Sequence, residues 1–285
     1  RALMKREEVD VIQLALPVYG ANDTQVLNNL RQAVASLQES WTGQRPSAIP
    51  MVPEELTMDV FLNLPTTQEA IQNHELPIAI SCEEAEIIPI NPSTLKNIVV
   101  LSEGKQSLQY TICHLVSVIN HCLDNGHVLL VDSNEEYSFL KEKANAYISG
   151  EEILDLFSNL DKEITNRKET PKDVQTFIVI PDLASFVEKV SISEDDFYQL
   201  YINAYKYGLH FITAGSKSVF FKVNPVIKVI KENITTAVIA MRLYDQSIVE
   251  HNSNNREKKL EWDQAYIYDK GRTQKVKLIK QEIEE

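Results

Sequence analysis

The segment from Asn97 to Asn125 is the feature that most restricts how this chain can fold. It begins with a short apolar run, Ile98 to Leu101, which has the length and composition of a strand buried on both faces. A polar turn from Ser102 to Ser107 follows and holds the segment's one glycine, Gly104. Apolar residues then recur every three or four positions, the spacing of one helix face. Strand, glycine-containing turn and helix form the outline of a phosphate-binding loop, in which N–H groups at a helix start face an anion.

The side chains that usually complete such a loop are missing. The working pattern is G-x-x-x-x-G-K-[ST], in which Lys reaches the outer phosphates and the hydroxyl holds magnesium. With Ser102 at the first Gly position, Ser107 takes the second, Leu108 takes the Lys position and Gln109 takes the Ser/Thr position. The sequence therefore predicts a nucleotide-binding fold with a decayed site. The candidate residues of this degenerate Walker A loop are Ser102, Gly104, Lys105, Gln106, Ser107, Leu108 and Gln109.

Two consequences for ligands follow from this pattern. Backbone N–H groups from Gly104 to Leu108 need no particular side chain, so weak ATP binding stays open. Lys105 is either a substitute for the missing lysine or a solvated turn residue. Without the Ser/Thr hydroxyl we expect no magnesium, no other metal and no catalytic residue in this domain.

Composition and charge limit the partners. A hydrophobic content of 44% and a charged content of 24% are ordinary for a globular protein, and no apolar run approaches the roughly 20 residues that span a bilayer. The net charge of −13 disfavours nucleic acid, whose binding depends on Lys and Arg neutralising phosphates. Because the first residue is Arg1 rather than Met, we expect the chain to be part of a longer polypeptide that can carry a membrane anchor elsewhere.

The cysteines and histidines do not indicate a metal site. Three cysteines form no paired framework, which is typical of a reducing compartment. His114 and His121 are seven residues apart on one predicted helix and so lie about 10 Å apart along its axis. One zinc ion cannot collect both at the usual ligand distances.

Apolar runs alternate with helical patterns along most of the chain, which predicts an α/β fold. We expect a mostly parallel, twisted sheet covered by helices on both faces and followed by a C-terminal β-hairpin. A Gly- and Pro-rich crossover from Gly43 to Pro53 separates residues 1–48, an arm or the tail of a preceding domain, from residues 49–285. In the arm, Val9 to Leu16 is a predicted strand, and Asn22 with Gln25 is a predicted helix-capping pair.

Ligands of such sheets gather at the carboxyl ends of the strands. We therefore expect one rim to contain Ser102–Gln109, Asp132, Pro181–Asp182 and Thr213–Lys217. We interpret Asp132 as a solvated strand-end carboxylate.

Six landmarks in order and spacing resemble the FtsK/SpoIIIE family of ring-forming ATPases. More narrowly, they are similar to the last ATPase-like domain of type VII secretion membrane ATPases of the EssC/YukB kind. The landmarks are IPMVPEEL (Ile49–Leu56), PIAISCEEAEIIPI (Pro77–Ile90), NIVVLSEGKQS (Asn97–Ser107), HVLLVD (His127–Asp132), TFIVIPDLASFV (Thr176–Val187) and YGLHFITAG (Tyr207–Gly215).

The resemblance implies a RecA-like P-loop NTPase fold and places a degenerate Walker B strand end at Pro181 and Asp182. Family members carry adjacent acidic residues there, which hold magnesium and polarise the attacking water. Proline at the first position supplies no carboxylate, so we expect no ATP hydrolysis by this domain alone. Thr213 and Ser216, at the end of the last landmark, are candidates for contacting the γ-phosphate.

The resemblance also implies a role in type VII protein secretion, at the cytoplasmic side of the cell membrane. We expect substrate recognition and coupling to active motor domains. The expected partners are other ATPase domains of the same polypeptide, small helical-hairpin WXG-type secreted proteins and a possible ring oligomer, with no nucleic acid. Two alternatives stay open: an ATP-hydrolysing ring ATPase with an atypical loop and, less favoured, a DNA translocase domain.

Overall fold

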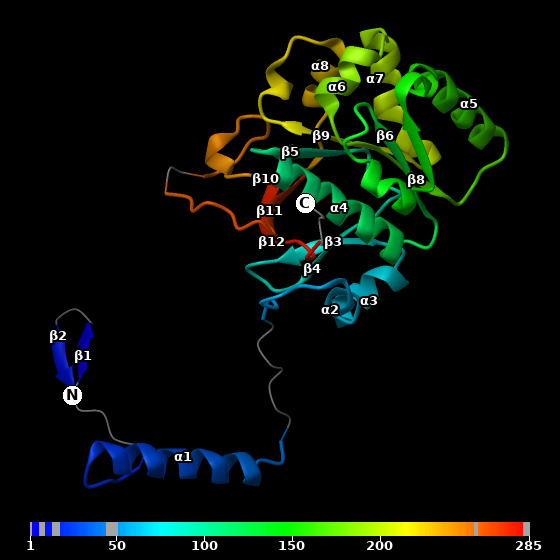
Figure 1. The fold of residues 1–285 in the computed structure, drawn as a ribbon. Coiled ribbons are helices and arrows are strands. Elements are labelled where there is room, and N and C mark those ends of the chain that lie inside the picture. The colour runs from blue at the N-terminus through cyan, green and yellow to red at the C-terminus, as the bar shows by residue number, and fades with distance from the viewer. Residues whose placement is uncertain (1, 6–8, 13–17, 44–50, 254–255, 282–285) are drawn as a thin grey trace. The chain divides into compact units, whose positions relative to one another are not determined.

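A computed structural model describes residues 2–5, 9–12, 18–43, 51–253 and 256–281 (Figure 1). The chain divides into two compact units, residues 1–49 and residues 50–285. The predicted strand from Val9 to Leu16 is present as Val9–Ile12, and its remaining residues lie outside the described ranges.

The first unit contains a two-stranded antiparallel sheet, β1 (Ala2–Lys5) and β2 (Val9–Ile12), and one helix, α1 (Asp23–Ser40). The predicted capping pair is confirmed. The Asn22 side chain accepts the N–H of Gln25 at 2.9 Å, and the Gln25 side chain accepts the N–H of Ala21 at 2.9 Å. Within the described part of this unit, α1 has no buried residue.

The second unit is built on one sheet of ten described strands in the order β4-β3-β12-β11-β10-β5-β9-β8-β6-β7. The strands from β10 to β7 run parallel to one another, and those from β4 to β10 pair antiparallel. The predicted mostly parallel sheet with a terminal hairpin is confirmed. The bounds are β3 (Leu76–Ser81), β4 (Ile87–Ile90), β5 (Ile98–Ser102), β6 (Gly126–Asp132), β7 (Ala146–Ser149), β8 (Gln175–Ile180), β9 (Leu209–Ser216), β10 (Thr236–Ala240), β11 (Gln264–Asp269) and β12 (Arg272–Lys277).

Helices cover both faces of this sheet (Figure 1). The α-helices are α2 (Met58–Leu62), α3 (Pro65–Gln72), α4 (Lys105–Cys122), α5 (Leu156–Glu169), α6 (Leu183–Lys189), α7 (Glu194–Asn203) and α8 (Pro225–Glu232). Short 3-10 helices are η1 (Ser138–Lys143), η2 (Gly150–Asp155), η3 (Ala204–Tyr207), η4 (Val219–Phe221) and η5 (Leu243–Asp245).

The central strand β5 shows why both faces need cover. Ile98 and Val100 enter the core that contains α4, whereas Val99 and Leu101 enter the core that contains α5 to α8. Side chains alternate across a strand, so an uninterrupted apolar run buries one set on each face. The predicted two-sided burial of this strand is confirmed.

Candidate functional site

Four parallel strands, β5, β9, β8 and β6, are neighbours in this order, so their carboxyl ends meet at one edge. The predicted rim is confirmed for Ser102 and Ser216, the last residues of β5 and β9, and for Asp182, which lies two residues after the end of β8. Thr213 is an exception because it lies within β9 and is completely buried. It therefore belongs to the core and not to a ligand surface.

The turn between β5 and α4 differs from the predicted loop. Strand β5 ends at Ser102 and helix α4 begins at Lys105, so Glu103 and Gly104 alone separate them. The prediction of a turn reaching Ser107 is wrong, since Gln106 and Ser107 belong to the first helical turn. Gly104 has an extended backbone, with φ of −142° and ψ of 163°, and so lacks the left-handed geometry of an anion-binding nest.

The Ser102 hydroxyl closes this short turn on itself. It donates to the carbonyl oxygen of Gly104 at 2.8 Å and accepts the N–H of Gly104 at 3.2 Å. One N–H that a phosphate-binding loop would direct at its ligand is thus bonded within the turn. The remaining N–H groups at the start of α4 belong to a regular helix end.

The other candidate side chains of the loop are engaged or buried. The Ser107 hydroxyl donates to the carbonyl oxygen of Ala240 at 3.2 Å, and Leu108 is part of the buried core. The exposed Lys105 ammonium pairs with the Glu136 carboxylate at 2.8 Å. Its positive charge is therefore already balanced by an acid. Gln106 is exposed and Gln109 is half-buried.

Asp182, the remaining acid of the expected metal-binding pair, is the N-cap of α6. One oxygen, Oδ1, accepts the N–H groups of Ala184 and Ser185 at 3.0 and 3.3 Å. The other, Oδ2, accepts from the Ser185 hydroxyl and from the Asn134 amide. A carboxylate used in this way stabilises the helix start, and both of its oxygens are occupied by protein donors.

Asp132 is buried, so its interpretation as a solvated carboxylate is wrong. Its Oδ2 accepts the N–H of Tyr137 at 2.8 Å and the hydroxyl of Tyr147 at 3.0 Å. Burial and the contact with Asp132 raise the pKa of Tyr147 to about 12. The carboxylate thus joins β6 to the neighbouring strand β7 and to the following turn.

A hollow of about 600 Å³ lies beside the β5–α4 turn and is lined by Glu103, Lys217, Arg242 and Asp245 among others. Lys217 donates to the backbone carbonyl of Asp245, and the Arg242 guanidinium pairs with the Asp245 carboxylate at 2.6 Å. Two cations and two acids give this hollow a balanced charge. A triphosphate would meet no excess positive charge there.

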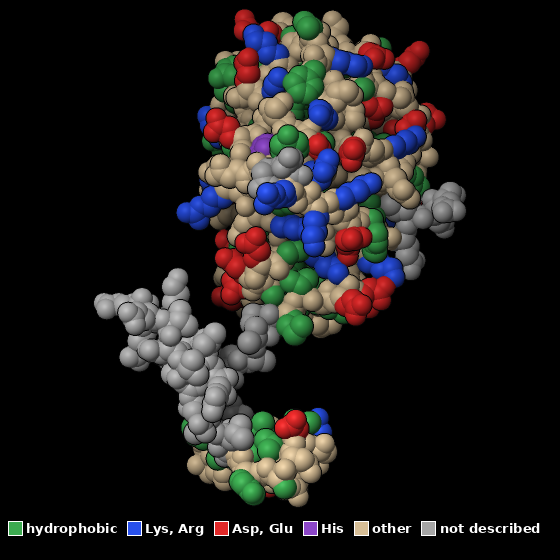
Figure 2. Space-filling model, turned by 90° about the vertical axis from the view of Figure 1, so that its left-hand side faces the viewer, with side chains coloured by type: hydrophobic (Ala, Val, Ile, Leu, Met, Phe, Trp, Pro, Cys, Tyr) green, Lys and Arg blue, Asp and Glu red, His purple; other side chains and the backbone are tan. Residues whose placement is uncertain are grey.

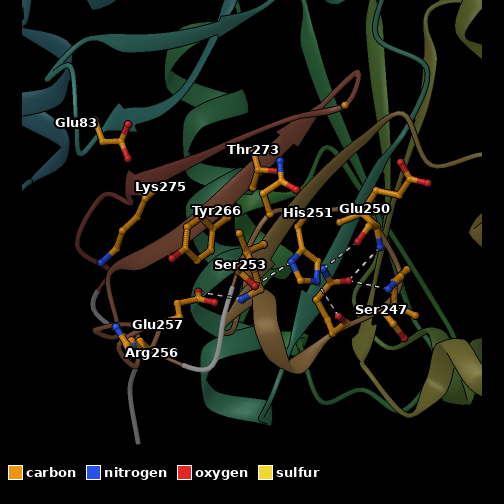
Figure 3. Close-up of a pocket in the computed structure, with 16 residues that line it drawn as sticks. Glu83, Ser247, Glu250, His251, Ser253, Arg256, Glu257, Tyr266, Thr273 and Lys275 are labelled. Carbon is orange, nitrogen blue, oxygen red and sulfur yellow. Dashed lines mark hydrogen bonds between the residues drawn. The ribbon is translucent and has the colours of Figure 1, made fainter.

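A second hollow, of about 1140 Å³, lies between the loop after β10 and the β11–β12 hairpin (Figure 3). His251 holds the loop together, with Nε2 at 3.1 Å from the carbonyl oxygen of Gln246 and Nδ1 at 2.9 Å from the Ser253 hydroxyl. Glu257 accepts the N–H groups of Leu243 and Tyr244 at 2.9 and 3.0 Å. This hollow was not predictable from the sequence, because a polar loop before a hairpin carries no distinctive motif.

A groove with an apolar floor lies over η4 and the start of α8 and has a volume of about 730 Å³. Phe221 is half exposed and Val223 is fully exposed. Lys231 lies over the Phe221 ring, 4.9 Å from its centroid. Lys222 and Lys228 border the same groove and pair with Glu188 and Glu194. A groove with apolar side chains in its lining suits the apolar face of an amphipathic helix.

Charge is unevenly spread over the larger unit. Figure 2 shows Lys and Arg side chains gathered across the middle of one face, with Asp and Glu side chains above and below them. A net charge of −13 does not exclude a local basic patch of this kind.

The two histidines of α4 lie in different environments. His114 is completely buried, with Nε2 at 2.7 Å from the carbonyl oxygen of Ile78 and Nδ1 accepting the N–H of Ile279 at 3.1 Å. His121 bonds the carbonyl oxygen of Ser117 at 2.7 Å. Among the described residues, no group of three or more His, Cys, Asp or Glu side chains is placed to hold a metal. In the same part of the chain, no helix is long and apolar enough to cross a bilayer.

No protein-family model matches the chain. Among curated proteins, the type VII secretion system protein EssC of Staphylococcus aureus (strain MRSA252) is 20% identical over 284 residues, covering 98% of this chain and 19% of that protein. The ESX secretion system protein YukB of Bacillus subtilis (strain 168) is 20% identical over 298 residues, covering 98% of this chain and 20% of that protein. The chain therefore spans about a fifth of the length of these relatives.

Solved structures agree with these relatives. EssC (ATPases 2 and 3) from Geobacillus thermodenitrificans superposes with a TM-score of 0.74 at 18% identity, over 98% of this chain and 55% of that chain. Thermomonospora curvata EccC (ATPases 2 and 3) in complex with a signal sequence peptide gives a TM-score of 0.61 at 17% identity, over 92% and 50%. The predicted ATPase fold and the resemblance to the EssC/YukB kind of secretion ATPase are confirmed.

Proposed function

We propose that this chain is an ATPase-like domain of a type VII protein secretion motor that no longer hydrolyses ATP and acts in substrate recognition and in coupling to active motor domains. The observation that carries this proposal is the two-residue turn between β5 and α4. It leaves no concave loop for the phosphates. At the position where a lysine would reach them stands the buried Leu108.

The acidic pair that would hold magnesium for phosphoryl transfer is also incomplete. Phosphoryl transfer depends on metal ions and cations that neutralise the developing charge. Pro181 supplies no carboxylate, and the carboxylate of Asp182 caps α6. Leu108 and Asp182 thus have structural roles, and the domain keeps the fold of a motor domain without its catalytic groups. Such a fold can still bind a partner and transmit movement.

Substrate recognition is the activity that the surface supports best. One structural relative, the Thermomonospora curvata EccC, was solved with a signal sequence peptide. We place the recognition of a helical export signal in the groove formed by Phe221, Val223 and the lysines around them. The partners are small helical-hairpin WXG-type proteins, and the domain works at the cytoplasmic side of the membrane within a larger, membrane-anchored polypeptide.

The test is a pull-down of a candidate helical-hairpin protein with and without its C-terminal tail. We expect wild-type protein to retain the full-length form and to lose the truncated form. Val223→Asp should abolish retention, because it places a carboxylate in the apolar part of the groove lining. Leu154→Asp is the matched control, since Leu154 is also an exposed apolar residue, at 63% exposure, on the separate helix η2. Equal retention of the truncated form, or equal loss in both variants, would count against the proposal.

A further inference from the structure

The β1–β2 hairpin of the first unit has the same pattern as the β11–β12 hairpin of the second. Ala2 lies opposite Ile12, as Ala265 lies opposite Val276. Two positions further along the first strand of each hairpin stand Met4 and Ile267. When these pairs are matched, every other pair of the first hairpin also matches a pair of the second, with one residue fewer between the matched strands. In sequence the match continues beyond the second strand, where Leu14 corresponds to Leu278.

The matching apolar positions are those that the second unit buries. Ala265, Ile267, Val276 and Leu278 are at most 2% exposed. Their hairpin is enclosed by the sheet, because β11 pairs with β10 and β12 pairs with β3. The opposite face of β12 is more polar and contains the half-buried Lys275, which corresponds to Val11.

A two-stranded hairpin by itself is at best marginally stable in water, so the first hairpin needs a sheet to join. The equivalent place in the sheet of the second unit is already filled by β11 and β12. For the same reason, a second copy of this chain offers no vacancy. The partner must therefore be another domain with the same kind of sheet, in which β1 and β2 serve as the last two strands.

We infer that β1 and β2 are the terminal hairpin of a preceding domain with the same architecture and insert between the counterparts of its β10 and β3. This inference is independent of whether either domain binds nucleotide. Of the two interpretations given for residues 1–48, an arm or the tail of a preceding domain, it supports the second. The α1 helix and the residues after it then connect two domains of one fold.

Hydrogen exchange tests the inference on two proteins, residues 1–285 and the longer natural polypeptide that includes the preceding domain. In residues 1–285, the amides of β1 and β2 should exchange almost without protection. In the longer polypeptide, their protection should rise at least about a hundredfold, toward that of β11 and β12. Equal exchange of the hairpin in the two proteins would overturn the inference.

A pair of neighbouring substitutions in the longer polypeptide separates insertion from nonspecific ordering. Ile12→Lys places a charge at the counterpart of buried Val276, whereas Val11→Lys reproduces the Lys275 of the second hairpin. We expect Ile12→Lys to remove the gained protection and Val11→Lys to retain it. Loss of protection in both variants, or in neither, would contradict the assignment of faces and with it the inference.

Discussion

Acid should destabilise the second unit through two buried histidines. His114 connects three elements, since its ring bonds the carbonyl oxygen of Ile78 in β3 and the N–H of Ile279 after β12 from its position on α4. His210 is also buried and lies against the carbonyl oxygen of Lys96 at 3.3 Å and the Gln175 amide at 2.9 Å. Burial lowers the pKa of each histidine from 6.5 to about 4, because the charged ring would lose its hydration.

The pKa values determine the size and the direction of this effect. A folded-state pKa below the unfolded-state value means that the unfolded chain binds more protons, so stability falls as the pH falls from 6.5 toward 4. Between pH 7 and pH 5, each histidine should lower the free energy of unfolding by about 2 kcal/mol, and both together by about 4 kcal/mol. Above pH 7 the contribution of both histidines is fully present.

Urea unfolding at pH 7 and pH 5 measures this difference directly. We compare the wild type with His114→Gln and His210→Gln, because glutamine keeps one donor and one acceptor but does not titrate near these pH values. Each variant should lose about half of the pH dependence, regardless of its own stability at pH 7. An unchanged free energy of unfolding at the two pH values in the wild type, or the full wild-type difference in both variants, would refute the reasoning.

Three further substitutions test the site and the fold. Asp182→Ala should lower the free energy of unfolding by about 1–2 kcal/mol through loss of the α6 cap, without changing an ATP titration; a change in ATP affinity would contradict the capping role. Leu108→Lys combined with Gln109→Thr restores the missing Walker side chains, yet should not create magnesium-dependent ATP binding, since the turn stays two residues long; gained binding by calorimetry would show that side chains alone were lacking. Gly208→Ala should lower the unfolding free energy by at least about 1 kcal/mol, because φ is +67° and an added Cβ would lie 2.7 Å from the Val174 carbonyl oxygen; unchanged urea unfolding would contradict this.

The positions of most strands along the chain were predictable, because short apolar runs bounded by turns identify buried strands directly. The boundaries of α4 were not. Aligning the segment with a phosphate-binding loop assigned Ser102 to Ser107 to a turn, whereas Lys105 and Gln106 are good helix formers and directly follow Gly104 at the N-cap. Local propensity determined the helix start, and the family pattern did not.

The two acids of the rim show a different limit. Asp132 is buried because Tyr147 lies beside it on β7, a short and partly exposed strand that the apolar pattern did not indicate. Asp182 precedes Leu183, Phe186 and Val187, whose spacing predicts a helix face and could have identified it as a cap. The family comparison directed attention to metal binding instead. Strand-end carboxylates therefore need their neighbours before a role can be assigned.

Calorimetric titration of residues 1–285 with ATP, in the presence and absence of magnesium, tests the central claim most directly when combined with a phosphate-release assay on the same sample. We predict that any binding is weak, that magnesium does not strengthen it and that no phosphate is released. Saturable, magnesium-dependent binding accompanied by turnover would show that the short turn between Ser102 and Lys105 still supports the chemistry of an active motor.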